Sequence, residues 1–361
     1  MKQWKKESGG KAIGFLLSDV PEEMIHAAGF FPYAIVGGST NLEEANAHLQ
    51  SWACSHSRSA LARALEGELD FLDGLIIPHT CDTMRMLLDL WEHLRPLPYM
   101  ENFRLPRQVN RASAGQYLVG ELERIKKGLE IYRGSPIEKG ELQESIKLYN
   151  QNRLLLRRLT ELHNHSPNLI NSRQLYTVIN AAMIMPREEV NRLLKLALED
   201  LEQKPINESS AQYLPLLMSG TLLEPFEVLD YLEEFGGTVI ADDFQNGYRY
   251  IEADVSTATD PLKALADRQL KRIPSAVFDI EQNPRRYFLT GLAKEKKAVG
   301  AIFLHLTFCE PENFDSYDNL KAMQDEGLPA IRIETQFGGA GLGQIRTRIH
   351  AFMEMVGGES R

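Results

Sequence analysis

The stretch that decides the fold is Leu75-Ile76-Ile77-Pro78-His79-Thr80-Cys81-Asp82. Its apolar first part, Leu75 to Ile77, predicts a buried strand that ends at Pro78. A helical pattern follows over Thr83 to His93, so the strand is expected to deliver Cys81 to the carboxyl edge of a sheet. Ligands of open α/β sheets bind at that edge. The stretch therefore predicts a parallel sheet with a functional thiol.

The same alternation of strands and helices continues on both sides. Further strands are predicted over residues 12–17, 33–36, 98–100, 214–218, 238–241, 299–304 and 329–334. Helices are expected over residues 41–49, 53–65, 225–235, 261–270, 284–296, 319–325 and 342–355, and Pro21 is expected to start another. Strands alternating with helices indicate doubly wound parallel sheets. We expect an α/β protein with one such sheet near each end of the chain.

The middle of the chain has a different pattern. Apolar residues recur there at three- and four-residue spacing, which predicts packed helices and almost no strand. The polar stretch 203–212 is expected to be a linker. We therefore predict an α/β domain over 1–109, a helical segment and linker over 110–212, and a second α/β domain over 213–361.

Size and charge narrow the class of protein. A chain of 361 residues is long for a single core. A net charge of -10 and a pI of about 5.5 argue against a nucleic-acid groove and favour a small-molecule or protein partner. No apolar run is long enough to cross a membrane, and the N-terminus lacks the apolar core of a signal peptide. We expect a cytoplasmic protein.

The chain has three cysteines, Cys54, Cys81 and Cys309, and each has a histidine within four residues. Cys54 is expected in the first turn of a helix, and the other two at strand ends. Three thiolates can hold an iron–sulfur cluster with one iron left open to a substrate. Cysteine and histidine also suit zinc, and buried, unconnected thiols are a third possibility. Because no CxxC pair is present, the residues alone leave these alternatives open.

Small polar loops follow the predicted strands and are expected at the same sheet edges. They let backbone N–H groups approach an anion or a thioester oxygen, although the same residues are also good turn formers. The candidates for substrate contact, or for a place beside a cysteine ligand, are Ser18, Gly38, Ser39, His56, His79, Asp82, Ser219, Gly220 and Gln336. No residue is identified as the acid or base.

Two further motifs each allow a functional interpretation and a purely structural one. The glycine-rich loop over residues 338–343 invites a phosphate-binding interpretation, but a turn is more typical so near the end of the chain. The pair Asp242-Asp243 suits a metal or an acid–base site, and helix capping equally. The chain has no GxxxxGK[ST] motif, so we expect no nucleotide on it.

Several segments together resemble the 2-hydroxyacyl-CoA dehydratase and benzoyl-CoA reductase family. They are Val20-Pro21-Glu22-Glu23-Met24-Ile25-His26-Ala27-Ala28-Gly29, Trp52-Ala53-Cys54-Ser55, Pro78-His79-Thr80-Cys81-Asp82, Phe308-Cys309-Glu310-Pro311-Glu312, and Ile345-Arg346-Thr347-Arg348-Ile349 with Phe352 and Glu354. The similarity extends from about Lys11 to Met355, with the elements in the same order.

This resemblance implies two flavodoxin-like domains with a 4Fe–4S cluster between them. Cys54, Cys81 and Cys309 would be its ligands. It also implies a homologous second subunit, an acyl-CoA substrate, and a separate ATP-dependent iron–sulfur activator that supplies one low-potential electron. Reduction of the thioester carbonyl to a ketyl radical then expels the hydroxyl group.

Four functions follow as hypotheses. The first is a subunit of an oxygen-sensitive 2-hydroxyacyl-CoA dehydratase, and the second is the small subunit of a benzoyl-CoA reductase. A third is a non-catalytic subunit that relays electrons. A zinc-stabilised binding protein is the fourth.

Overall fold

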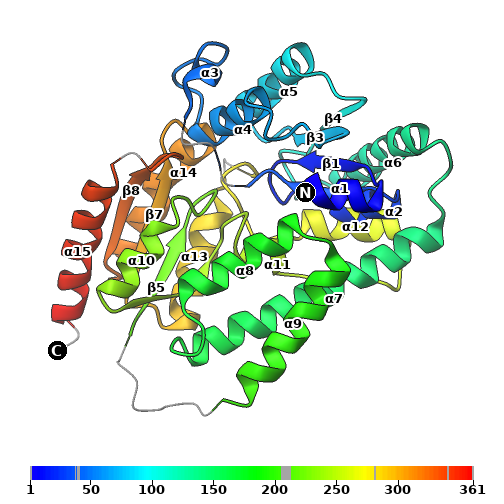
Figure 1. The fold of residues 1–361 in the computed structure, drawn as a ribbon. Helices are drawn as coiled ribbons and strands as arrows, with labels where there is room; N and C mark the ends of the chain where they lie inside the picture. The colour runs from blue at the N-terminus through cyan, green and yellow to red at the C-terminus, as the bar shows by residue number, and fades with distance from the viewer. Residues whose placement is uncertain are drawn as a thin grey trace. The chain divides into compact units, whose positions relative to one another are not determined.

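The structure is a computed structural model that describes residues 2–36, 38, 41–204, 213–279, 282–339 and 341–359. The chain forms two compact units (Figure 1). Unit 1 comprises Met1–Arg153, Ala182–Val190 and Ala253–Arg272, and unit 2 comprises Leu154–Ala181, Asn191–Glu252 and Ile273–Arg361. Each unit is built around one parallel sheet, as the alternation of strands and helices predicts.

Unit 1 holds a four-stranded parallel sheet in the order β2-β1-β3-β4. Its strands are β1 (Ala12–Phe15), β2 (Phe31–Ala34), β3 (Gly74–Pro78) and β4 (Tyr99–Phe103). The helices around it are α1 (Lys2–Ser8), α2 (Glu22–Ala27), α3 (Glu43–Asn46), α4 (Ser55–Leu65), α5 (Asp82–Leu94), α6 (Ala114–Arg133) and α12 (Pro261–Leu270). This strand order is that of flavodoxin-like sheets, and its switch point lies between β1 and β3.

Unit 2 repeats the arrangement with the order β6-β5-β7-β8. Its strands are β5 (Leu214–Ser219), β6 (Gly237–Asp242), β7 (Gly300–Leu306) and β8 (Ala330–Thr335). Helices α10 (Glu227–Glu234) and α15 (Leu342–Glu359) pack on one face, and α13 (Pro284–Lys296) and α14 (Glu310–Asp325) on the other. The switch point of this sheet lies between β5 and β7.

The middle segment is helical, as predicted. Helices α7 (Lys139–His165), α8 (Ser172–Ile184) and α9 (Arg187–Glu202) each contribute residues to both units. Within unit 2, His163 on α7 contacts the carbonyl oxygen of Val239 through Nε2 at 2.9 Å and so covers the free edge of β6. The boundaries 109/110 and 212/213 stay a prediction, and most of the predicted linker, residues 205–212, lies outside the described residues.

Helix α3 is shorter than the expected 41–49 and α15 extends past the expected end at 355, but three other helices depart further from the sequence expectation. Helix α14 begins at Glu310, whereas apolar spacing predicted a start at 319, because its first turns carry mostly acidic and aromatic residues without a periodic apolar face. Two short helices, α1 and α11 (Tyr248–Ile251), were not predicted. Over the described ranges, no helix combines the length and the apolar character needed to span a membrane.

Candidate functional site

All three cysteines occupy the position immediately before a helix. Cys54 precedes α4, Cys81 precedes α5 and Cys309 precedes α14, each with an extended backbone conformation. In each case the cysteine carbonyl oxygen accepts a hydrogen bond from the backbone N–H four residues further on. Cys54 therefore lies at the N-cap rather than in the first turn. The three thiols share one structural position.

None of the three sulfur atoms caps its own helix. Cysteine is also not among the residues usually preferred at an N-cap, which are Ser, Thr, Asp and Asn. A sulfur at this position lies at the positive end of the helix dipole, where negative charge is favoured. The position of all three cysteines therefore suits anionic ligands of a metal centre.

The two cysteines of unit 1 differ in exposure. Cys54 is buried, and its sulfur lies 3.3 Å from the hydroxyl oxygen of the buried Ser57. Cys81 is half-buried and follows β3 at the carboxyl edge of the sheet. The loop before it is fixed by two contacts: the His79 N–H donates to the carbonyl of Phe103, and Arg107 donates to the carbonyl of Thr80.

Cys309 lies at the corresponding edge of the second sheet, after β7. It is buried, with 7% of its surface exposed. Its sulfur is 3.6 Å from the hydroxyl oxygen of Thr221, which follows β5 on the other side of the switch point. Phe308, immediately before it, has a φ of 66°, a left-handed conformation that is uncommon for a bulky residue. The backbone is therefore strained directly beside the thiol.

A buried arginine organises this edge of unit 2. Arg285 on α13 donates to the Ser219 hydroxyl at 3.0 Å, to Asp243 at 2.7 Å and to Glu312 at 3.2 Å, and also to Asp315 at 3.2 Å. Burial alone would lower the pKa of Arg285, but the three carboxylates raise it well above its ordinary value. The guanidinium therefore stays charged, and it connects the ends of β5 and β6 to the first turns of α14.

The carboxylates respond differently to this arginine. Burial opposes ionisation of Glu312, yet Arg285 holds the pKa of Glu312 below its ordinary value. Burial raises the pKa of Asp315, because Arg285 compensates for only part of its lost hydration. Glu312 also accepts a hydrogen bond from the Thr221 hydroxyl at 3.0 Å. A chain of polar contacts thus runs from Arg285 through Glu312 and Thr221 to Cys309.

The predicted loop residues lie in different environments. Ser18 and Ser219 are buried, and each hydroxyl accepts a hydrogen bond from an arginine, Arg272 or Arg285. Gly220 is also buried, and its N–H donates to Asp243. Gly38 is exposed and Gln336 half-buried, while Ser39 lies outside the described residues. Whether any of them contacts a substrate stays a prediction.

The polar residues next to the cysteines also differ. His56 is buried, and burial together with Arg63 lowers its pKa to about 4, so it is neutral at physiological pH. His79 is half-buried, and burial followed by Arg107 and Arg85 lowers its pKa. Asp82 is exposed in the first turn of α5, where a carboxylate stabilises the helix.

The acidic pair and the glycine-rich loop have structural roles. Asp242 accepts hydrogen bonds from the Tyr176 hydroxyl at 2.6 Å and from the backbone of Phe244 and Tyr248, and so anchors the start of α11. Asp243 binds Arg285. The loop before α15 contains three glycines with positive φ, at 338, 339 and 341, so its turn requires them.

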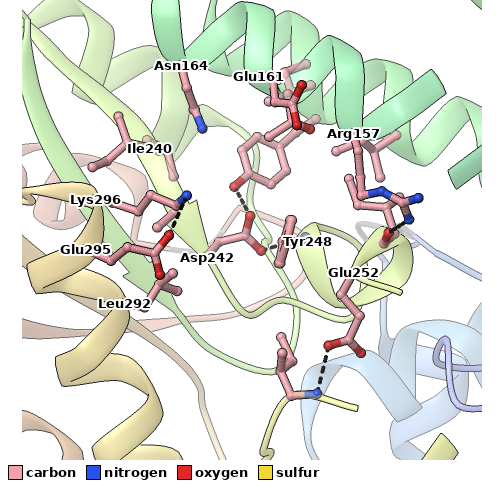
Figure 2. A pocket seen from close by; sticks show the side chains of 18 of the residues that line it. Arg157, Glu161, Asn164, Ile240, Asp242, Tyr248, Glu252, Leu292, Glu295 and Lys296 are labelled. Carbon is pink, nitrogen blue, oxygen red and sulfur yellow. Dashed lines mark hydrogen bonds and ion pairs between the residues drawn. The ribbon is translucent and has the colours of Figure 1, made fainter. Parts of the chain in front are cut away.

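A cavity of about 300 Å³ opens in unit 2 beside the edge strand β6 (Figure 2). Side chains of α7, including Arg157 and Glu161, and the carboxyl of Asp242 line it together with Lys296 from α13. Burial raises the pKa of Asp242 to about 6. Among the residues that the structure describes, no cysteine and no predicted loop residue lines this cavity. Asp242, the last residue of β6, lines it, so the cavity reaches the carboxyl edge of this sheet without including Cys309.

No three His, Cys, Asp or Glu side chains are grouped so that they could hold a metal ion, within the part of the chain that the structure describes. Cys54 and Cys81 belong to unit 1 and Cys309 to unit 2. Ligation by all three cysteines therefore stays a prediction. Its support here is their common position at helix starts.

Sequence reasoning did not single out Arg285, Glu312 or Arg272. Arginine and glutamate are usually solvated on helix surfaces, so only burial reveals these three. One signal was available for Glu312, which lies three residues after a candidate ligand within a segment that supported the family resemblance.

These features define a class of protein: an α/β chain with two parallel sheets of flavodoxin-like strand order and three cysteines at helix starts. A family model described as 2-hydroxyglutaryl-CoA dehydratase, D-component, matches residues 17–356, and the chain belongs to that family.

The relatives are named as subunits of enzymes with acyl-CoA substrates. One component of the benzoyl-CoA reductase of Thauera aromatica is 31% identical over 86% of this chain and 82% of its own length. The beta subunit of lactoyl-CoA dehydratase from Anaerotignum propionicum is 28% identical over 99% of this chain and 94% of its own. The beta subunit of (R)-2-hydroxyglutaryl-CoA dehydratase from Acidaminococcus fermentans is 28% identical over 97% and 94%. The expected family is confirmed.

Proposed function

We propose that this chain is one iron–sulfur subunit of an oxygen-sensitive 2-hydroxyacyl-CoA dehydratase. Cys54, Cys81 and Cys309 are its ligands to a 4Fe–4S cluster. The observation that carries the proposal is that all three cysteines of the chain lie at helix N-caps, in a chain whose relatives are named as dehydratases of acyl-CoA substrates. Three cysteine ligands would leave one iron without a protein ligand.

The chain supplies position and electrostatics to this reaction. The bound cluster supplies a low-potential electron for loss of water from the thioester. The helix starts hold the three thiolates, and the Arg285 network fixes the start of α14 beside Cys309. Burial of Cys54 and Cys309 limits the access of water and oxygen to their sulfur atoms.

The proposal includes two protein partners. The dehydratase relatives are named as beta subunits, which supports a homologous second subunit for this chain. The sequence contains no P-loop motif, so we assign ATP hydrolysis to a separate iron–sulfur activator. Low-potential reduction and ATP both suit a cytoplasmic location.

A role in a benzoyl-CoA reductase is the alternative, and the 31% identity to a component of such a reductase favours it. Both enzymes need one difficult electron transfer to a thioester, so the same ligand set serves either. In either assembly this chain binds the acyl-CoA or relays the electron to the subunit that does.

Anaerobic reconstitution tests the proposal. The chain is combined with its homologous subunit, the activator, ATP and a strong reductant, and is offered lactoyl-, phenyllactyl-, 2-hydroxyglutaryl- and benzoyl-CoA. Mass spectrometry should show loss of water from one 2-hydroxyacyl thioester. Gain of hydrogen by benzoyl-CoA would establish the reductase instead. Turnover by the isolated chain in air, without ATP, would contradict both assignments.

A further inference from the structure

We propose that the hydroxyl proton of Thr221 tunes the electron affinity of the metal centre through the sulfur of Cys309. Thr221 is then a positioning residue for the redox step. Arg285, through Glu312, influences whether the Thr221 hydroxyl donates to Glu312 or to Cys309. This inference rests on the proposed function, because it requires Cys309 to be a cluster ligand.

The geometry places the Thr221 hydroxyl between Glu312 and Cys309. A Cys309 sulfur that binds the cluster as a thiolate can only accept, so Thr221 is then one donor between two acceptors. The Thr221 hydroxyl oxygen lies 3.0 Å from the Glu312 carboxylate and 3.6 Å from the Cys309 sulfur. A threonine hydroxyl carries a single proton, so it can donate fully to only one of them at a time. The contact crosses the switch point between β5 and β7, the place in such sheets where ligands bind.

Arg285 influences how strongly Glu312 competes for the hydrogen bond from the Thr221 hydroxyl. The same Glu312 oxygen that accepts from Thr221 also accepts from Arg285 at 3.2 Å. The guanidinium is fixed by Asp243 and Ser219, and His305 lies 3.8 Å from the other Glu312 oxygen. Because Arg285 satisfies part of the carboxylate's charge, the hydroxyl is available to the sulfur when the sulfur is anionic.

A hydrogen bond to a ligand sulfur changes the reduction potential. Reduction adds negative charge to the cluster and its thiolates, and a donor to sulfur stabilises the reduced state more than the oxidised one. Donation from Thr221 to Cys309 therefore raises the potential, and donation to Glu312 leaves it lower. The Arg285–Glu312 pair thus acts on the cluster without contacting a ligand.

The test is a redox titration of the reconstituted protein, followed by electron paramagnetic resonance, after its iron content has been measured. Thr221→Val keeps the shape of the side chain and removes the proton. We expect it to retain iron and to shift the midpoint to a more negative potential, by up to about tenfold in the reduction equilibrium, or about 59 mV for one electron. Thr221→Ser should restore the wild-type value.

Two further variants isolate the mechanism. Glu312→Gln removes a buried charge as well as an acceptor, so it is made with and without Thr221→Val. The midpoint shifts should not add, because both changes act on the same proton. Thr290→Val is the matched control: Thr290 on α13 donates to backbone carbonyls of its own helix, and its replacement should leave the midpoint unchanged.

The outcomes separate the two proposals. If the wild-type chain takes up no cluster, or Cys309→Ser keeps the full cluster, the proposed function fails and this inference fails with it. If cluster binding is normal but Thr221→Val has the wild-type midpoint, or Thr290→Val shifts equally, only the inference is overturned. Thr221→Ala replaces Thr221→Val if valine is not accommodated. Loss of iron from both hydroxyl-free variants would show that the hydroxyl retains the ligand rather than tuning it, and would also overturn the inference.

Discussion

Arg285 donates a hydrogen bond to the hydroxyl of Ser219 across 3.0 Å. In the other unit Arg272 donates to the hydroxyl of Ser18 across 2.9 Å. Ser219 is the last residue of β5 and Ser18 lies three residues beyond β1, so both serines are near the carboxyl end of the second strand in sheets of the same order. Both loops are therefore held from within by a buried guanidinium, which predicts a structural contribution from these serines.

Replacement of Ser219 should lower stability first. Ser219 is fully buried, so Ser219→Leu overpacks the loop and removes an acceptor from Arg285. We expect the free energy of unfolding to fall by about 2–5 kcal/mol, measured by anaerobic urea denaturation. Ser135→Leu, at an exposed site, is the control and should have little effect. Unchanged stability with reduced turnover would instead place Ser219 at the substrate.

Gly220 should tolerate no side chain. A Cβ atom there would lie 2.4 Å from the carbonyl oxygen of Leu304, so the loop or β7 must move. We expect Gly220→Ala to lower the free energy of unfolding by about 1–3 kcal/mol. Gly291→Ala, in the same unit, has open space on helix α13 and should stabilise the protein by about 1 kcal/mol. Thermal unfolding of the two variants compares them directly, and equal melting temperatures would refute the predicted close contact.

Loss of the Arg285 charge should be among the most damaging single changes in unit 2. Arg285→Met leaves Asp243, Glu312 and Asp315 buried without their cation. Breaking such a network typically costs about 3–5 kcal/mol. The control is Arg346→Met, which breaks an exposed ion pair with Glu234 and should hardly change the unfolding midpoint. Similar midpoints for the two variants would contradict this role.

Asp242 should make stability depend on pH. Burial raises its pKa to about 6, from an ordinary value of 3.8. An acid with a raised pKa stabilises the folded state while protonated, so this contribution is present below about pH 4 and is lost as the pH rises to about 6. The free energy of unfolding that Asp242 contributes should therefore fall by on the order of 3 kcal/mol over this range.

Asp242→Asn does not titrate, so it isolates this effect. The stability of wild type relative to this variant should fall between about pH 4 and about pH 7, as measured by urea denaturation at both values. A relative stability that is constant or rises with pH would show that the Asp242 carboxyl is not protonated in the folded protein near pH 4.

The sequence was sufficient to predict the two parallel sheets and the strand ends that carry Cys81 and Cys309, whereas the chemistry at those edges stays a prediction. The apolar run Leu75 to Ile77 is bounded by Pro78 and followed by a helical pattern, so Cys81, between strand and helix, was expected at the carboxyl edge. The common N-cap position of the three thiols was harder to predict from the sequence. Cys54 has no strand immediately before it, and element boundaries shift by one or two residues between pattern and structure.

Long-range polar contacts could not be predicted. Arg285 is 27 residues from Glu312 and 42 from Asp243, and no local pattern distinguishes it from the solvated arginines of other helices. The start of α14 was missed for a related reason. Glu312 and Asp315, which the strand-and-helix pattern assigned to a loop, face a buried guanidinium instead of an apolar core.

If Cys54, Cys81 and Cys309 bind one iron–sulfur cluster, the iron content of the chain depends on all three thiols. The wild-type chain, purified and reconstituted without oxygen, should hold about four iron and about four sulfide atoms. Cys54→Ser, Cys81→Ser and Cys309→Ser should each lose most of this iron, whereas Ser57→Ala, which keeps every thiol, should retain it. Full iron content in all three serine variants, or a wild-type chain without iron, would contradict the account.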